Sequence, residues 1–211
     1  MVRAVNPKLP QPLPGFEQVN RYWDKRMNLA AAKILPGEFY VSDQGEMIVT
    51  VLGSCIAACI RDKILGIGGM NHFMLPFKED DADRWGNKVS AASRYGNWAM
   101  EYLINAILSQ GGSRRNLEVK LFGGGQVLAN MTDVGKNNIE FALSYLEEEG
   151  LSVVAQDVGG PYPRKVLYFP DTGAVKMRKL KSVHNDTVER REREYSRSIE
   201  VKPAGGDVEL F

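Results

Sequence analysis

The segment 46–75 constrains the fold of this chain most strongly, because it has the pattern of a strand, a break and a β-hairpin in close succession. Its first residues are rich in Val and Ile, as strands are, and Gly53-Ser54 interrupts that run. Two short apolar runs follow, 55–61 and 66–75, separated by a four-residue connection. This pattern predicts an antiparallel hairpin.

The hairpin brings a cysteine close to a histidine. With its turn centred between Lys63 and Ile64, Cys55 lies directly opposite His72. Opposed residues share one face of a sheet and have Cβ atoms about 4.5–5.5 Å apart, within reach for a thiol and an imidazole. The chain has two cysteines and two histidines, so few pairs are available for nucleophilic catalysis. The sequence therefore predicts a site built on Cys55 and His72, and a slip of one residue would separate them.

Length and composition indicate a soluble protein with one main domain. The 211 residues suit one α/β domain with about 30 to 40 residues of extension. A formal charge of +1 gives no general attraction to nucleic acid or to membranes. The start of the chain lacks the pattern of a signal peptide, and the apolar stretch 47–60 falls short of the roughly 18–20 residues of a spanning helix. We expect no membrane insertion, a cytoplasmic protein and free cysteines.

The chain divides into three regions by composition. We predict a Pro-rich arm with a short helix near 22–33 in residues 1–36, a catalytic domain in 37–180, and a charged tail in 181–211. The tail contains a dense run of mixed charge at 189–194, which favours a solvated helix or a mobile segment.

Within the central region, apolar residues spaced by three and four predict helices over 93–109 and within 133–150. The predicted strands are 38–42, 46–52, 117–122, 151–157, 165–169 and 174–178, besides the hairpin strands. Helices and strands alternate only in the middle, and the ends favour hairpins. We therefore predict an α/β layered sandwich with a mixed, largely antiparallel sheet and two main helices. The polar segment 78–88 is predicted to be a surface loop beside the site.

Other interpretations of these residues are structural. A free buried cysteine is often an inert small hydrophobe, and packing is the role predicted for Cys59. A lone histidine can be a core residue, and His184 is predicted to be exposed. Two histidines and two cysteines without ligand spacing predict no metal site. The glycines 123–125 lack the Lys-Ser/Thr ending of a phosphate-binding loop and favour a tight turn at a sheet edge.

Five segments, in one order along the chain, resemble the CheD family of chemoreceptor glutamine deamidases of bacterial chemotaxis. They are Leu52-Gly53-Ser54-Cys55, Gly69-Met70-Asn71-His72-Phe73-Met74-Leu75-Pro76, Lys120-Leu121-Phe122-Gly123-Gly124, Asp157-Val158-Gly159-Gly160 and Arg164-Lys165-Val166. The resemblance extends from about residue 37 to residue 180. It departs from the family's common pattern at Pro163, where a glycine often stands.

The resemblance implies a protein-glutamine glutaminase without cofactor or metal, which converts receptor glutamines to glutamates through a Cys thioester and releases ammonia. It implies that Cys55 is the nucleophile, His72 the general base and acid, and Thr50 the third member. The residues expected to hold the oxyanion or to contact substrate are Gly53, Ser54, Asn71 and Arg164. The implied partners are chemoreceptor cytoplasmic helices and, in some bacteria, a CheC-type phosphatase.

Two other classes of protein remain open at this point. A cysteine peptidase or transamidase would use the same cysteine and histidine but would need a longer substrate cleft. A non-catalytic chemotaxis adaptor that binds the receptor or a CheC-type phosphatase would keep the fold without depending on Cys55. Ammonia release distinguishes the first from a deamidase, and a Cys55→Ala variant distinguishes the second.

Overall fold

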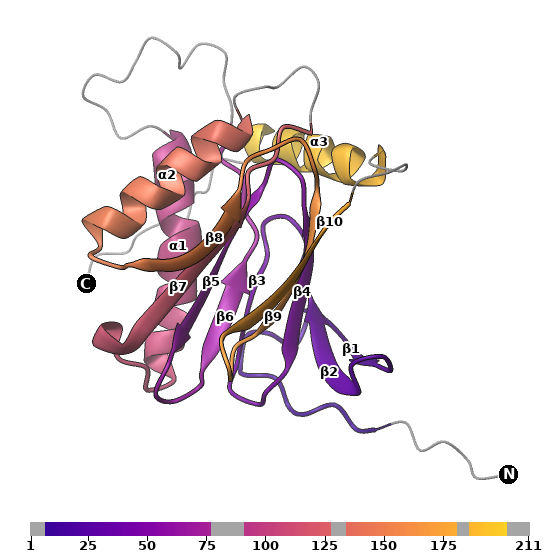
Figure 1. Ribbon diagram of the computed structural model, residues 1–211, viewed down its shortest axis with the longest axis vertical. Coiled ribbons are helices and arrows are strands. Elements are labelled where there is room, and N and C mark those ends of the chain that lie inside the picture. Colours follow the sequence, from indigo (N-terminus) through magenta and orange to yellow (C-terminus); the bar gives the residue numbers. More distant parts are fainter. Residues whose placement is uncertain (1–6, 77–90, 128–133, 181–185, 202–211) are drawn as a thin grey trace, which may run out of the picture.

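The computed structural model describes residues 7–76, 91–127, 134–180 and 186–201. Within these residues the strands form two five-stranded sheets, accompanied by three α-helices (Figure 1). The predicted loop 78–88 and His184 lie outside the described residues.

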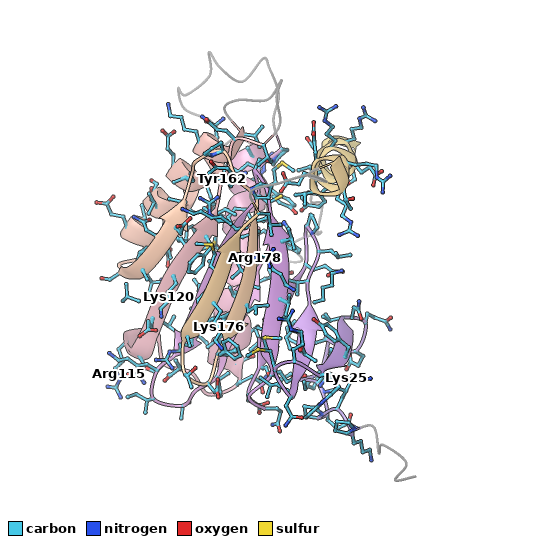
Figure 2. The ribbon with its side chains drawn as sticks, turned by 45° about the vertical axis from the view of Figure 1, so that its right-hand side comes forward. Lys25, Arg115, Lys120, Tyr162, Lys176 and Arg178 are labelled. Carbon is cyan, nitrogen blue, oxygen red and sulfur yellow. The ribbon has the colours of Figure 1, made fainter. Side chains whose placement is uncertain are left out.

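The first sheet has the strand order β1-β2-β4-β9-β10. These strands are β1 (Asn20–Asp24), β2 (Leu29–Lys33), β4 (Met47–Leu52), β9 (Arg164–Phe169) and β10 (Ala174–Lys179). Neighbouring strands are antiparallel, except for the parallel pair β2 and β4. The edge strand β10 carries exposed Lys176 and Arg178 (Figure 2), and such charges hinder edge-to-edge pairing with another sheet.

The second sheet has the strand order β3-β6-β5-β7-β8. Its strands are β3 (Phe39–Ser42), β6 (Gly68–Asn71), β5 (Ile56–Asp62), β7 (Leu117–Gly123) and β8 (Val153–Val158). Here too the pairs are antiparallel, except for the parallel pair β7 and β8.

Helices α1 (Ala91–Ser109) and α2 (Val134–Glu148) cover the outer face of the second sheet (Figure 1). A short 3-10 helix, η2 (Arg114–Asn116), leads into β7. Helix α3 (Asp186–Val201) lies apart from this layer, at one end of the strands. The main core joins apolar residues of both sheets and of α1 and α2. In the described part of the chain no helix is both long and apolar enough to cross a membrane.

The predicted α/β layered sandwich is confirmed, and the two predicted main helices are α1 and α2. The strands, however, are divided over two sheets and not gathered in one. The predicted helix near 22–33 is wrong, because β1 and β2 form a hairpin there. Asn28, at φ 51°, helps to form its turn, and pairing of β2 with β4 buries Ala31 and Ala32. Tertiary pairing thus outweighs the helix propensity of the alanines.

The predicted hairpin is present, but its register differs by two residues. Cys59 pairs with Met70, which puts residue 74, and not His72, opposite Cys55. The turn lies one residue later than expected because the Asp62 carboxylate accepts hydrogen bonds from the backbone N–H groups of residues 64 and 65, at 2.8 and 3.0 Å. A shift of two residues preserves the face of the sheet. Cys55 and His72 therefore still share the face that looks toward the first sheet, as diagonal neighbours.

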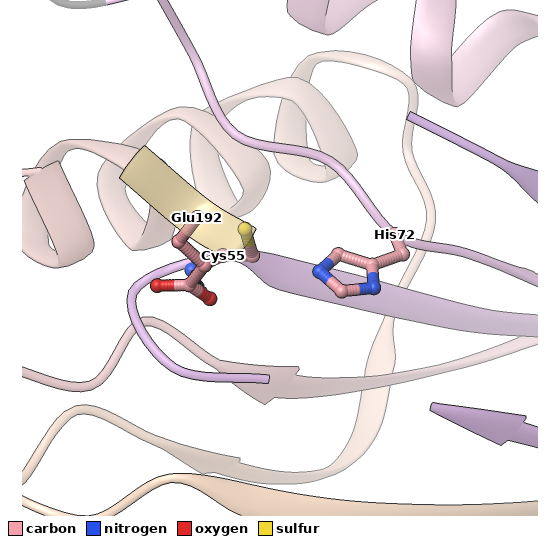
Figure 3. Close-up of side chains that lie close together, drawn as sticks. All are labelled: Cys55, His72 and Glu192. Carbon is pink, nitrogen blue, oxygen red and sulfur yellow. Dashed lines mark hydrogen bonds between the residues drawn. The ribbon is translucent and has the colours of Figure 1, made fainter. Parts of the chain in front are cut away.

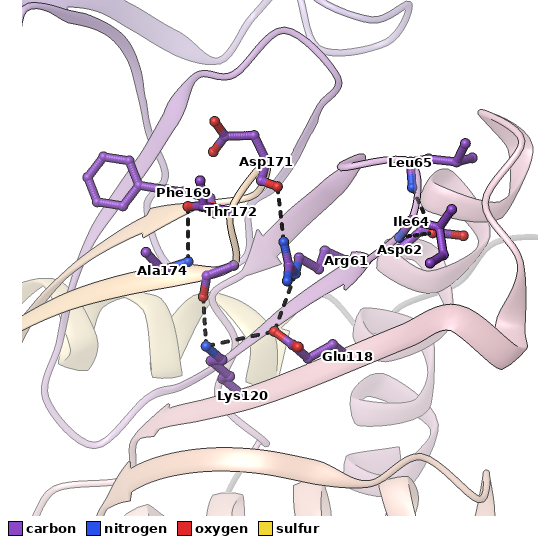
Figure 4. Close-up of polar contacts among 11 residues, drawn as sticks. Arg61, Asp62, Ile64, Leu65, Glu118, Lys120, Phe169, Asp171, Thr172 and Ala174 are labelled. Carbon is purple, nitrogen blue, oxygen red and sulfur yellow. Dashed lines mark hydrogen bonds and ion pairs between the residues drawn. The ribbon is translucent and has the colours of Figure 1, made fainter.

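Side chains of the second sheet tie down the β9–β10 turn of the first (Figure 4). Arg61 donates to the carbonyl of Asp171 at 3.0 Å, and Lys120 donates to the carbonyl of Gly173 at 2.7 Å. Glu118 lies between the two cations, 3.3 Å from Arg61 and 3.7 Å from Lys120. These contacts join the sheets at the end remote from the β4–β5 connection, and so help to fix the space between them.

Candidate active site

The connection Gly53-Ser54-Cys55 carries the chain from β4 in the first sheet to β5 in the second, and the glycines that end β7 hold its backbone. The N–H groups of Gly124 and Gly125 donate to the carbonyls of Cys55 and Gly53, both at 2.7 Å. A Cβ atom at Gly123, where φ is +113°, would lie 2.2 Å from the Cys55 carbonyl oxygen. Only glycine allows this approach. The run predicted to be an edge turn instead supports the segment that holds Cys55.

Asn138, on α2, supports the same segment from the other side and was not predicted from the sequence. Its amide donates to the Ser54 carbonyl and accepts from the Leu75 N–H, both at 2.8 Å, and the side chain is fully buried. It therefore links the Cys55 connection to the chain that follows His72. A single asparagine in an amphipathic helix gives no sequence signal for such a role.

Thr50 and His72 meet between the two sheets. Strand alternation turns Thr50 inward, and its hydroxyl lies 2.8 Å from Nδ1 of His72 and donates to the Ile34 carbonyl at 2.9 Å. Because the hydroxyl has one proton and gives it to Ile34, it must accept from Nδ1–H of the imidazole. This assigns the neutral tautomer in which Nε2 carries the lone pair.

The Cys55 thiol lies between His72 and a carboxylate from α3 (Figure 3). The Cys55 Sγ, a ring nitrogen of His72 and a carboxylate oxygen of Glu192 all lie within 4.8 Å of one another. Nε2 of His72 is buried and has no hydrogen-bond partner in the described part of the chain. Its lone pair is therefore available as a base.

Burial determines the charge state of this pair. It lowers the pKa of His72 to about 3, which keeps the imidazole neutral. It also raises the pKa of the Cys55 thiol well above its usual value, and the neighbouring Glu192 carboxylate raises it further. In this arrangement the pair is a neutral thiol beside a neutral imidazole, so a thiolate forms here only if a base takes the thiol proton.

Glu192, like Asn138, is a contact of the site that the sequence did not predict. Its Oε1 accepts from the N–H groups of Gly53 at 2.8 Å and Cys55 at 3.2 Å. Its Oε2 accepts from the N–H and the hydroxyl of Ser54, at 2.8 and 2.7 Å. The tail was expected to be solvated or mobile, but Glu192 is only 1% exposed. One glutamate within a run of mixed charge looks like any other in the sequence.

Two predicted substrate contacts have internal partners. The Asn71 amide accepts from the Ala58 N–H at 2.8 Å and donates to the Ala99 carbonyl at 3.0 Å, which links β5 to α1. Arg164 is buried, forms an ion pair with Asp157 at 2.6 Å and donates to the carbonyls of residues 159 and 162. Both groups hold the fold around the site, and their contact with substrate stays a prediction.

Cys55, His72 and Glu192 are donor types that zinc sites use. Each Glu192 oxygen, however, already accepts two hydrogen bonds, and Thr50 occupies Nδ1 of His72. A metal ion would have to replace the backbone and hydroxyl donors around the carboxylate. The N–H and O–H groups that surround the Glu192 carboxylate suit a carboxylate or a carbonyl oxygen better than they suit a cation.

The fold and the site together define an α/β sandwich protein with a candidate Cys-His-Thr centre where its two sheets meet. Residues 74–179 match the family model described as CheD chemotactic sensory transduction. The chain is 59% identical to a "Probable chemoreceptor glutamine deamidase CheD" of Halorhodospira halophila, over 96% of this chain and 94% of that one. It is 53% identical to one from Saccharophagus degradans, over 97% and 95%. The chain belongs to the CheD family.

A solved structure, Neisseria meningitidis protein NMB0706, is similar with a TM-score of 0.37 and 11% identity over 64% of both chains. A likeness of this size supports no functional conclusion.

Proposed function

We propose that this chain is a chemoreceptor glutamine deamidase in which Cys55 is the nucleophile, His72 the general base and acid, and Thr50 the residue that orients His72. Membership of the CheD family supports the reaction. The observation that carries the residue assignment is the hydrogen bond from Nδ1–H of His72 to Thr50, which leaves the Nε2 lone pair free beside the Cys55 thiol.

The first half of the reaction forms a thioester. Nε2 of His72 takes the thiol proton as Sγ of Cys55 attacks the side-chain carbonyl carbon of a glutamine. The N–H groups of Gly53 and Cys55 point at one oxygen position, where the oxyanion would form. When the carbon–nitrogen bond breaks, protonated His72 returns its proton to the departing ammonia.

The second half hydrolyses the thioester. His72 removes a proton from water as the water oxygen attacks the thioester carbon, and the carbon–sulfur bond breaks. The thiol recovers its proton and the side chain leaves as glutamate. Thr50 has no charge, so it orients the imidazole without the electrostatic stabilisation of the imidazolium that an aspartate gives in a serine protease triad.

We propose cytoplasmic receptor helices as the substrate, and a cytoplasmic location follows from that choice. Binding of a CheC-type phosphatase and the domain boundaries at residues 36 and 180 stay predictions. The adaptor alternative explains neither the ordered Thr50–His72 contact nor the free Nε2.

The test mixes the full chain with a glutamine-bearing cytoplasmic fragment of a chemoreceptor from the same organism. We expect ammonia release and the mass gain of an amide-to-acid exchange, both absent with Cys55→Ala. Cys59→Ala is the matched control, because Cys59 is equally buried in β5, and it should retain conversion. Binding of the fragment without any conversion would favour the adaptor.

A further inference from the structure

Helix α3 approaches the active site through one of its faces. The residues of this face are at least partly buried and follow helical spacing, namely Val188, Glu192, Tyr195, Ser196 and Ile199. Glu194, on the opposite face, is exposed and lies 3.9 Å from Arg190. The inner face has a carboxylate at its centre, where a helix packed on a core normally presents an apolar residue.

The carboxylate occupies the position that the reaction needs for its oxygen atoms. Oε1 accepts from the N–H groups of Gly53 and Cys55, and Oε2 accepts from Ser54. The Glu192 carboxylate accepts all four hydrogen bonds and donates none, as an ionised carboxylate must. Glu192 also has the same side chain as the glutamate that the proposed reaction produces. Among the described residues of α3, Glu192 alone accepts hydrogen bonds from these backbone N–H groups.

Two glycines make room for the helix. A Cβ atom at Gly53 would lie 2.6 Å from Oε2 of Glu192, and one at Gly37 would lie 2.8 Å from the ring of Tyr195. The Tyr195 hydroxyl is also hydrogen-bonded to that of Tyr95 on α1. The surface beside Cys55 is therefore shaped for an α-helix at close range, with one long side chain directed at the thiol.

The docked helix closes the site. Cys55 is fully buried and His72 is 1% exposed, so no substrate side chain reaches the thiol while α3 is in place. The charge of Glu192 also contributes to the raised pKa of the Cys55 thiol, after burial itself. Access of any other side chain to the thiol requires α3 to leave, and the departure of Glu192 removes one of the causes that raise the pKa of the Cys55 thiol.

We propose that α3 is a product-like internal ligand of the active site, with Glu192 in the place of the reacting side chain, and that a receptor helix carrying a glutamine docks on the surface that α3 vacates. This inference rests on the proposed deamidase function and adds the substrate's docking surface and a competitor from the same chain.

Glu192→Gln turns the helix into an internal substrate and gives the sharpest test. The carboxamide oxygen can accept from the Gly53 and Cys55 N–H groups, and the Ser54 hydroxyl can accept from the amide nitrogen, whereas the Ser54 N–H, which donates to Oε2 at 2.8 Å in the native chain, loses its acceptor. We expect the amide at position 192 to be converted to the acid in the purified chain, as read from the mass of its tryptic peptide. The conversion should stop in the Cys55→Ala background. Glu194→Gln, with the same charge change on the exposed face of α3, should keep its amide.

Activity on the receptor fragment tests the competition. When α3 is docked in most molecules, the apparent rate equals the rate of the open form multiplied by the fraction of molecules that are open. We therefore expect Glu192→Ala to deamidate the fragment about tenfold faster than wild type, and Glu194→Ala to do so at the wild-type rate. Wild-type activity in Glu192→Ala, together with a stable amide in Glu192→Gln, would overturn the inference and leave the proposed function intact. If no variant converts either the receptor fragment or the amide at position 192, the proposed function is wrong, and the product-like role of Glu192 is wrong with it.

Discussion

Replacing Thr50 with valine tests the arrangement of the site, because the change removes one hydroxyl and nearly preserves shape. In the native chain this hydroxyl donates to the Ile34 carbonyl at 2.9 Å and accepts from Nδ1–H of His72 at 2.8 Å. Both partners are in a closed interior, with His72 only 1% exposed. The variant leaves a carbonyl and an N–H without a partner.

The expected magnitudes follow from those two contacts. A buried polar group left unsatisfied costs about 1–3 kcal/mol, so with two such groups we expect Thr50→Val to lower the free energy of unfolding by about 2–6 kcal/mol. The imidazole also loses the contact that selects its tautomer, and the proton can move to Nε2, where it blocks the base. If about 1.4–2.8 kcal/mol of orientation is lost, kcat/KM falls about 10- to 100-fold, since each 1.36 kcal/mol is tenfold.

The assay combines urea denaturation, kcat/KM on the receptor fragment and the imidazole nitrogen NMR shifts of His72. Thr50→Ser is the matched control, because it keeps the hydroxyl and should restore the native tautomer and most of the activity. A Thr50→Val chain that keeps both the wild-type kcat/KM and the Nδ1–H tautomer would refute the role of Thr50. A chain that is destabilised but fully active would reduce Thr50 to a structural residue.

Three further predictions concern residues around the pair. Asn138→Ala should lower the unfolding free energy by about 2–6 kcal/mol and reduce activity, because the Ser54 carbonyl and the Leu75 N–H lose their partner; full activity at unchanged stability would contradict this. Burial sets the folded pKa of His72 at about 3, against about 6.5 when unfolded. Between these values only the unfolded state binds the proton, so stability should fall as pH falls from about 6.5 to about 3, by up to about 5 kcal/mol. The stability of His72→Gln, measured by urea denaturation at several pH values, should lack this dependence. If wild type and His72→Gln lose stability in parallel as pH falls, His72 is not the cause. Iodoacetamide should label Cys55 faster in Glu192→Ala than in wild type, with Cys59 slow in both; unchanged Cys55 labelling would show that Glu192 does not control access.

Local patterns were sufficient for much of this fold. Apolar spacing predicted α1 and α2, and short apolar runs rich in Val and Ile predicted the strands that carry the site. The alanines of β2 gave the wrong prediction of a helix near 22–33, because their helix propensity stabilises the chain less than the pairing of β2 with β4 does. The hairpin register differed because the Asp62 side chain fixes the turn, an effect that run lengths do not reveal.

The site was predictable to the extent that its members lie close in sequence. Cys55 and His72 fall within one hairpin, and a shift of two residues kept them on the same face. Thr50 came from the family resemblance, and the structure supplies the hydrogen bond that gives it a physical role. Asn138 and Glu192 reach the site from far along the chain, so only the folded structure brings them there.

The most direct test of the central claim is to trap the acyl group on Cys55. The enzyme and a glutamine-bearing receptor fragment are mixed, quenched in acid and analysed by intact mass and peptide mapping, with a parallel reaction in hydroxylamine. We predict an adduct of enzyme and fragment that lacks the mass of ammonia and maps to Cys55, and a hydroxamate at the same glutamine in hydroxylamine. Conversion of the glutamine with neither species formed, or conversion that survives in Cys55→Ala, would contradict a thioester mechanism on Cys55.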